Sequence, residues 1–214
     1  MKILFIGNSA TYVHEIPETL ARLANEQGCD VKTESITRGG YMLSQYAEEQ
    51  GVYDTIKKGF DIVVFQDNGN CISSDEMREK CRSALGKMIK AAKESGANAY
   101  IYVRPPYGYP SFGYTPLEQC DEFDKLFLEI SEKEGAENIY VNRAFAEAIK
   151  TTDLKLWGPD NAHTSEQGAY LAVCIFFATI FKKSATILDT NGLPENEVDE
   201  IKKIADKISS EVKR

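Results

Sequence analysis

The stretch that decides the fold is KILFIGNS, residues 2–9. Its apolar side chains, residues 3–6, form a continuous run that ends directly at Gly7-Asn8-Ser9. A short, unbroken apolar run of this kind is typical of a strand whose two faces are both buried. The segment therefore predicts a central strand that ends in a polar turn, with Ser9 placed where a helix is about to begin.

Outward from this segment, short apolar runs alternate with longer amphipathic ones. We expect strands over residues 2–6, 30–36, 61–65, 99–103 and 138–141. We expect helices over residues 17–27, 44–58, 74–95, 115–134 and 164–181, and a last one from about residue 195. Strands and helices that alternate through short connections predict an α/β fold with a parallel sheet covered on both faces. We find no repeat or linker, and expect one domain over 1–214, with a core over 2–181 and a helical extension over 182–214.

The composition excludes several classes of protein. The chain has 214 residues, of which 43% are hydrophobic and 27% charged, as in ordinary globular proteins. Its net charge of −8 argues against nucleic-acid binding and against a basic membrane anchor. The longest apolar stretch, residues 169–181, is shorter than the ~18–20 residues that span a bilayer. We therefore expect a cytoplasmic protein with no membrane or nucleic-acid partner.

The five cysteines predict neither a disulfide framework nor a zinc site. Their number is odd and no two of them form a C-x-x-C pair. With only two histidines in the chain, a metal site has few ligands to draw on. We expect reduced cysteines and no metal.

The two histidines, His14 and His163, differ in their surroundings. Asp160 stands three residues before His163, so its carboxylate can reach one imidazole nitrogen and leave the other free to take a proton from a serine. The alternative is that His163 only caps the next helix. His14 has no acid at a suitable spacing, and we expect it to be a surface or capping residue.

Polar residues follow three of the expected strands. In open parallel sheets, sites form where the strands end. Ser9 follows the first strand, Gly40 the second and Asn68 the third. A hydroxyl at such a turn can act as a nucleophile, and the backbone N–H groups of Ser9 and Gly40 with the Asn68 amide can face an oxyanion. The alternative is that all three are ordinary turn residues.

The segment from Arg104 to Tyr114 is rich in proline, glycine and aromatic residues and follows the fourth strand. Such a loop can form the wall of a binding pocket, or it can simply be a packed surface loop. The candidates for substrate contact are Gln66, Arg104, Tyr107 and Trp157, followed by Tyr109 and Tyr114.

In their order along the chain, these segments resemble the SGNH (GDSL-like) hydrolase superfamily. Gly7-Asn8-Ser9 stands where that family has Gly-Asp-Ser, Gly40 matches the glycine of the second block, and Asp160-x-x-His163 matches the last block. The resemblance implies a flavodoxin-like three-layer α/β/α sandwich with a five-stranded sheet. It also implies a Ser9–His163–Asp160 triad with an oxyanion hole from Ser9, Gly40 and Asn68. Members commonly cleave esters, often acetyl groups on carbohydrates, and also lipid or thioester substrates. The mechanism that this implies needs no cofactor.

The third block departs from the family pattern. Where the family has Gly-x-Asn-Asp, this chain has Gln66-Asp67-Asn68-Gly69. Asn68 keeps its register, and Asn70 is the second candidate for its role. The departure resembles a little-characterised branch that has glutamine at this strand end.

Two other functions compete with a serine esterase. One is a catalytically degenerate member of the same fold that binds carbohydrate. The other is a flavodoxin-like module that holds phosphate or a nucleotide at residues 8–11, although no glycine-rich phosphate loop is present there. Nothing in the sequence indicates an oligomeric state.

Overall fold

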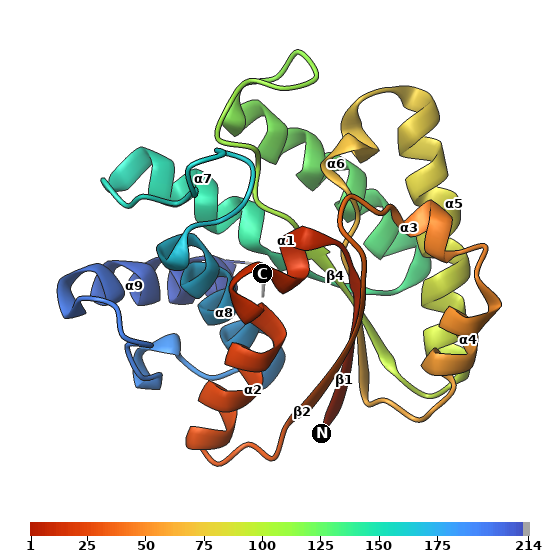
Figure 1. Ribbon diagram of the computed structural model, residues 1–214, viewed down its shortest axis with the longest axis horizontal. Helices are drawn as coiled ribbons and strands as arrows, with labels where there is room; N and C mark the ends of the chain where they lie inside the picture. The colour runs from red at the N-terminus through yellow and green to blue at the C-terminus, as the bar shows by residue number, and fades with distance from the viewer. Residues whose placement is uncertain (212–214) are drawn as a thin grey trace.

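The computed structural model describes residues 1–211 and has a single five-stranded sheet at its centre. The strands are β1 (Lys2–Gly7), β2 (Lys32–Thr37), β3 (Ile62–Phe65), β4 (Asn98–Val103) and β5 (Glu137–Tyr140). They are all parallel and lie in the order β2-β1-β3-β4-β5. Figure 1 labels β1, β2 and β4 of this sheet. Residues 3–6 of β1 are fully buried, as their apolar run predicts. The expected parallel α/β sheet is confirmed.

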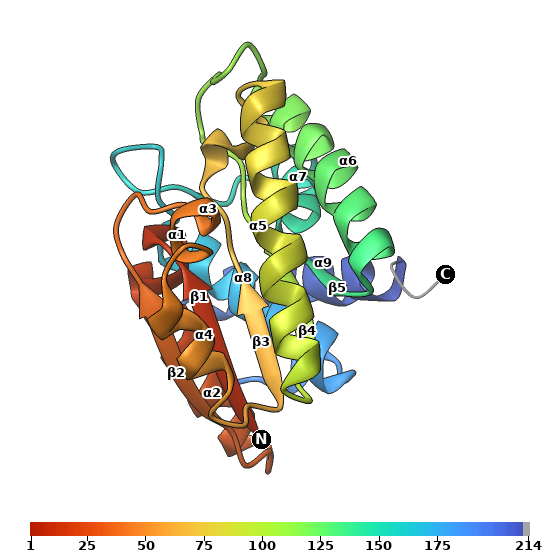
Figure 2. The ribbon, with the colours of Figure 1, turned by 90° about the vertical axis from the view of Figure 1, so that its right-hand side faces the viewer.

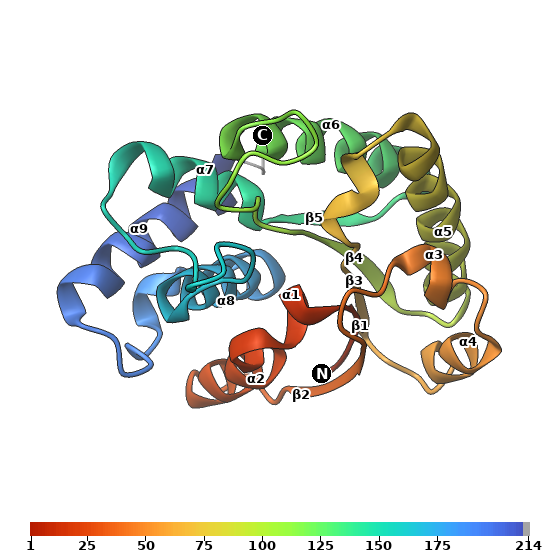
Figure 3. The ribbon, with the colours of Figure 1, turned by 45° about the horizontal axis from the view of Figure 1, so that its top comes forward.

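Helices cover both faces of this sheet. α2 (Ile16–Glu26) and α8 (Glu166–Phe181) lie on one face, and α4 (Gln50–Ile56), α5 (Asp75–Glu94) and α6 (Pro116–Glu134) on the other (Figures 2 and 3). α9 (Glu195–Glu211) packs on α8 from outside, so α8 is buried almost all round. A helix in that position needs apolar side chains on every side, which explains the apolar stretch at 169–181. The three-layer α/β/α sandwich is confirmed.

Several short elements were not expected, and one expected helix is broken. The short elements are α1 (Ser9–Tyr12), η1 (Val13–Glu15), η2 (Gly69–Ile72) and η3 (Ala185–Ile187). The expected helix over 44–58 divides into α3 (Leu43–Tyr46) and α4. Between them Glu49 has an extended backbone, and its carboxylate accepts hydrogen bonds from Arg38 and Tyr41. These tertiary contacts break a pattern that would otherwise run on as one helix.

The segment after β5 is a helix, α7 (Val141–Thr151), and not the end of a strand. Val141 was expected to be the last residue of the strand, and it is the first residue of α7. The buried Asn142 anchors the change of direction by donating hydrogen bonds to the Cys120 carbonyl and the Asp124 carboxylate. The buried apolar positions 141, 144, 145 and 148 have helical spacing, which is the signal that could have identified α7.

The expected starts of α5 and α6 are confirmed, whereas α3 begins at Leu43 and not at the expected Ser44. Thr115 and Glu118 form the capping box of α6, and the Ser74 hydroxyl caps α5. α8 is capped by Ser165 and not by Thr164, because the Ser165 hydroxyl accepts from the Gly168 N–H. Of the expected extension, residues 212–214 lie outside the described part. Within residues 1–211 no helix is both long and apolar enough to cross a membrane.

Gly168 provides a test of how α8 is seated. A Cβ at this position would lie 2.2 Å from the Leu156 carbonyl oxygen, a backbone atom that cannot move aside cheaply. We expect Gly168→Ala to lower the free energy of unfolding by about 1–3 kcal/mol or more, measured by urea denaturation. The matched control is Gly51→Ala in α4, where a Cβ meets nothing within 4 Å, and which should be neutral or stabilising by about 0.5 kcal/mol. Equal effects of the two substitutions would contradict this account of the packing.

Candidate active site

The four polar segments meet at the carboxyl edge of the sheet. The strand order reverses between β1 and β3, and ligands of open α/β sheets bind at such a switch point. Ser9 follows β1, residues 66–69 follow β3, and the loop with Gly40 follows β2. The loop that carries His163 reaches the same edge just before α8 (Figure 3).

The turn that carries Ser9 is packed tightly against β3. A Cβ on Gly7 would lie 2.5 Å from Thr11 Oγ1 and 2.7 Å from Gln66 Oε1, so only glycine fits. Gln66 Oε1 accepts hydrogen bonds from the Asn8 N–H and the Thr11 hydroxyl, both at 2.9 Å. The Asn8 side chain caps α1 by accepting from the Ala10 N–H. Ser9, the first residue of α1, is therefore held in place by its neighbours on both sides.

Gln66 has a different role from the one expected. Its side chain was a candidate for substrate contact, but the residue is only 1% exposed. Its oxygen holds the Ser9 turn and its nitrogen donates to the Asp67 carbonyl. Both ends of the amide are thus occupied, and Gln66 supports the nucleophile turn instead of facing a ligand.

Asp160 orients His163 through three hydrogen bonds. Its Oδ1 accepts from the backbone N–H groups of Ala162 and His163, at 2.9 and 3.0 Å. Its Oδ2 lies 2.6 Å from His163 Nδ1. The bond to the imidazole and then the two backbone bonds hold the pKa of the Asp160 carboxyl well below its usual range. Asp160 therefore stays charged and keeps a proton on Nδ1 of His163.

The other imidazole nitrogen faces Ser9. His163 Nε2 lies 2.8 Å from Ser9 Oγ, although the two residues are 154 positions apart in the chain. Ser9, His163 and Asp160 therefore form one continuous chain of hydrogen bonds. With Nδ1 protonated, Nε2 is free to accept the serine proton, so the geometry is suited to activating the hydroxyl as a nucleophile.

Hydrogen bonds join the loop that carries Gly40 to Asn8 and to Asn68. Asn68 Nδ2 donates to the Gly40 carbonyl at 3.0 Å, and Asn8 Nδ2 donates to the Tyr41 carbonyl at 2.9 Å, which ties the loops after β1, β2 and β3 together. Within residues 1–211 the backbone N–H groups of Ser9 and Gly40 donate to no protein acceptor. The Asn68 amide also has a second N–H that donates to no acceptor within the described residues.

Asp67 links two of these loops and was not singled out by sequence reasoning. Its Oδ1 accepts from the backbone N–H groups of Leu43 and Asn68, at 2.9 and 2.8 Å. The side chain is buried and forms no ion pair within the described residues. Burial raises the pKa of its carboxyl. The sequence signal that could have identified Asp67 is an acidic residue between a buried strand and Asn68.

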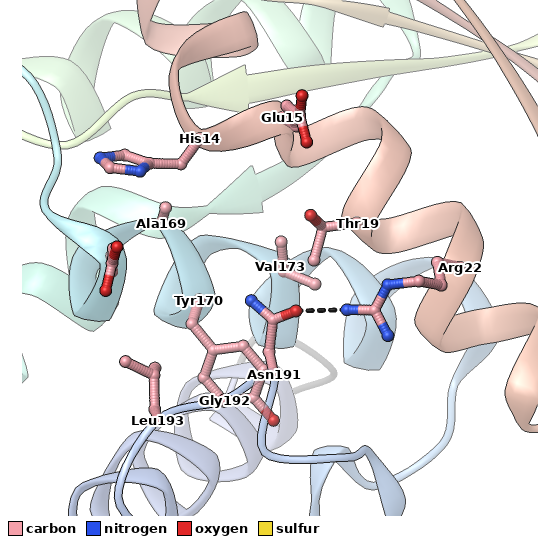
Figure 4. Close-up of a pocket in the computed structure, with 11 residues that line it drawn as sticks. His14, Glu15, Thr19, Arg22, Ala169, Tyr170, Val173, Asn191, Gly192 and Leu193 are labelled. Carbon is pink, nitrogen blue, oxygen red and sulfur yellow. Dashed lines mark hydrogen bonds between the residues drawn. The ribbon is translucent and has the colours of Figure 1, made fainter.

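His14 stands apart from the Ser9–His163–Asp160 chain. Its Nε2 lies 2.9 Å from the Thr164 carbonyl oxygen, one residue beyond His163. His14 lies at one end of a cavity of about 730 Å³, and Arg22, hydrogen-bonded to Asn191, lies at the other (Figure 4). Ser9, His163 and Asp160 do not line this cavity. His14 therefore contacts the backbone next to His163 on the side that faces this cavity.

The loop over residues 104–114 packs against the loop that carries His163. Trp157 Nε1 donates to the Pro106 carbonyl at 2.9 Å, and the Gly108 N–H donates to the Asn161 carbonyl at 2.7 Å. A Cβ on Gly108 would lie 2.9 Å from the Trp157 ring. Trp157, expected to contact substrate, is thus engaged in joining the two loops. Tyr107 and Tyr109 stack on each other with 5.3 Å between ring centroids, and Tyr109 is exposed.

All five cysteines have free thiols. Across residues 1–211, no three His, Cys, Asp or Glu side chains are grouped so as to hold a metal ion.

Similarity to known proteins is found in structure and not in sequence. No protein-family model matches the chain, and no curated protein does. A protein of Slackia heliotrinireducens assigned to the SGNH hydrolases has a TM-score of 0.69 at 22% identity, over 82% of this chain and 96% of that one. A DUF4886 family protein of Bacteroides uniformis has a TM-score of 0.83 at 13% identity, over 97% and 93%. Axe2, an acetylxylan esterase of Geobacillus stearothermophilus, has a TM-score of 0.64 at 18% identity, over 82% and 92%. At these identities the likeness shows a shared fold, that of the SGNH hydrolases.

The buried charge of Asp67 predicts a pH-dependent stability. Folding raises the pKa of the Asp67 carboxyl, so there is a pH range in which the folded chain keeps the carboxyl proton and the unfolded chain has lost it. Across that range the free energy of unfolding falls as the pH rises. Asp67→Asn can keep both N–H bonds through Oδ1 and removes the charge. We expect it to raise the free energy of unfolding by about 1 kcal/mol at pH 8, and by less at pH 5. Urea denaturation at the two pH values measures this; a gain that does not depend on pH would contradict it.

Proposed function

We propose that this protein is a serine hydrolase that cleaves a carboxylic ester through an acyl-enzyme. The observation that carries the proposal is the hydrogen-bonded chain from Ser9 Oγ through His163 to Asp160, with distances of 2.8 and 2.6 Å. Its members come from two segments far apart in sequence, and a nucleophile, a base and an orienting acid are the parts that acyl transfer requires.

In the first half of the reaction Ser9 Oγ attacks the ester carbonyl carbon while His163 Nε2 takes the hydroxyl proton. The negatively charged Asp160 stabilises the imidazolium that forms. The bond from carbon to the alcohol oxygen then breaks, and His163 returns its proton to that oxygen. The alcohol leaves, and the acyl group stays on Ser9.

In the second half a water molecule replaces the alcohol. His163 takes a proton from the water as the water oxygen attacks the acyl carbon. The bond from that carbon to Ser9 Oγ then breaks, and His163 returns the proton to Ser9 Oγ. The products are a carboxylic acid and free enzyme. In both halves the tetrahedral oxyanion faces the backbone N–H groups of Ser9 and Gly40 and the free N–H of Asn68.

An acylated carbohydrate is the substrate class that we favour. The fold is shared with an acetylxylan esterase, and the exposed ring of Tyr109, stacked on Tyr107, stands on the loop beside the His163 loop. Aromatic faces of this kind pack well against sugar rings. No cofactor or metal takes part in the proposed reaction.

Ser9→Ala tests the nucleophile. We expect the unaltered protein to hydrolyse 4-nitrophenyl acetate and to be labelled by a fluorophosphonate, and Ser9→Ala to lose both properties. Ser35→Ala, at an exposed position on β2, is the control and should keep both. Labelling of Ser9→Ala equal to that of the control would rule out Ser9 as the nucleophile. If the unaltered protein is not labelled at all, the degenerate binding protein becomes the better description.

The two histidines should behave differently. We expect His163→Ala to be nearly inactive, since no other base reaches Ser9 within the described residues. His14→Ala should lower the rate far less, because His14 reaches only the Thr164 carbonyl. Steady-state kinetics on the same ester measure both. Equal losses in the two variants would mean that the triad assignment is incomplete.

Asn68→Ala tests the altered third block. Removal of one oxyanion donor typically lowers kcat by about 10²–10³-fold. We expect a loss of that size in the hydrolysis of the ester, and Asn70→Ala should have a much smaller effect because its side chain is exposed. The reverse order of effects would place the donor at Asn70.

A further inference from the structure

Arg104 is a buried cation without a counter-charge. It directly follows β4, next to the end of β3, and is only 4% exposed. Its Nε donates to the Pro105 carbonyl at 2.9 Å, and its guanidinium carbon lies 4.2 Å from the centre of the Tyr107 ring. Within residues 1–211 it forms no ion pair, and its Nη1 and Nη2 donate to no protein acceptor. Both nitrogens still touch solvent, because neither is among the fully buried atoms that lack a partner.

The free end of this guanidinium lies against the segment that carries Asn68. A Cβ on Gly69 would be 2.6 Å from Arg104 Nη1 and 2.7 Å from the Tyr107 hydroxyl, so both groups converge above the residue that follows Asn68. The Tyr107 hydroxyl also has no acceptor within the described residues. Two donors, one of them positively charged, thus stand beside the proposed oxyanion hole with nothing to bind.

Gly69, the residue that lies against Arg104 Nη1, supplies no counter-charge. Where the family sequence has an acid after the asparagine, this chain has Gly69. Gly69 has no carboxylate and no side chain, so Arg104 Nη1 lies directly against the backbone of residue 69. Burial of an unpaired charge is unfavourable, and buried charges in proteins are normally paired, so an anionic group that reached Arg104 would supply the counter-charge it lacks.

We propose that Arg104 and Tyr107 form a subsite for a carboxylate group of the substrate, which would make the protein an esterase for acidic esters. The planar fork of a guanidinium matches a carboxylate through two parallel hydrogen bonds, and the Tyr107 hydroxyl can donate a third. The proposal rests on the esterase function proposed above and specifies the substrate of the same site. The carboxylate can belong to the acyl group or to the alcohol, as in an acetylated sugar acid.

Matched ester pairs test the subsite and locate the carboxylate. For the acyl side the pair is 4-nitrophenyl hydrogen succinate and its methyl ester; for the alcohol side it is 4-acetoxybenzoate and its methyl ester. After correction for the uncatalysed rates, we expect kcat/KM to favour the acidic member of at least one pair by about 10–100-fold, the range for hydrogen bonds to a charged group. In Arg104→Met this ratio should fall towards one, and in Tyr107→Phe it should fall by a few-fold.

Arg143→Met is the matched control. Arg143 also lies over a tyrosine ring, 3.7 Å from the centre of Tyr140, but it is paired with Asp124. We expect this variant to keep the preference of the unaltered protein. No preference for either acidic ester, or the same ratio in Arg104→Met as in Arg143→Met, would overturn the carboxylate subsite.

Binding without turnover separates this proposal from the esterase function. Succinate should bind to the Ser9→Ala protein in calorimetric titration, and Arg104→Met in that background should abolish the binding. Tighter binding of inorganic phosphate than of succinate would overturn the carboxylate assignment. Should Arg104→Met not fold, Tyr107→Phe and Gly69→Ala supply the same comparison, since a Cβ at residue 69 displaces both donors. Absent labelling of Ser9 with intact succinate binding would refute the esterase and leave the subsite standing.

Discussion

The close approach of β1 and β3 at Gly7 and Gln66 is the contact on which the site depends. The side chains of Thr11 and Gln66 lie so close to Gly7 that it has no room for a side chain of its own, and the Gln66 oxygen accepts from both Asn8 and Thr11. Buried polar groups must find partners, so these bonds leave the Ser9 turn little freedom. The sheet order that brings β1 next to β3 thus also sets the position of Ser9, the proposed nucleophile.

From that contact the remaining parts of the site are added by polar bridges between loops. Asp67 joins the segment at Leu43 to Asn68, Asn68 reaches the Gly40 carbonyl, and Asp160 folds its own loop around His163. The loop with Arg104 is joined to the His163 loop through Trp157 and Gly108. The polar side chains of the site therefore stand on short loops that follow rigid strands and are joined to one another by hydrogen bonds. Such an arrangement favours preorganised electrostatic catalysis.

Much of this arrangement could be predicted. All five strands were predicted, four of them from apolar runs and the polar edge strand β2 from its place between two helices. The position of Ser9, Asn68 and Asp160-x-x-His163 after or between elements indicated which side chains would meet. Where prediction failed, a long-range contact had overridden a local pattern. Glu49 leaves the helical conformation where its carboxylate binds Arg38 and Tyr41, and Asn142 turns the chain into α7 at the end of β5. Gln66 was a candidate for substrate contact, and the local sequence did not show that its side chain is buried.

The sequence by itself determined the class of fold and the chemical types present, since hydrophobic periodicity and turn residues act over short distances along the chain. It also showed that Gly69 stands in place of an acid. Only the tertiary structure decided which groups are paired. Ser9 and His163 are 154 positions apart, and their 2.8 Å hydrogen bond exists because the parallel sheet brings distant loops to one edge. The same packing buries Arg104 beside Gly69 and leaves its charge without a partner, which no local pattern could reveal.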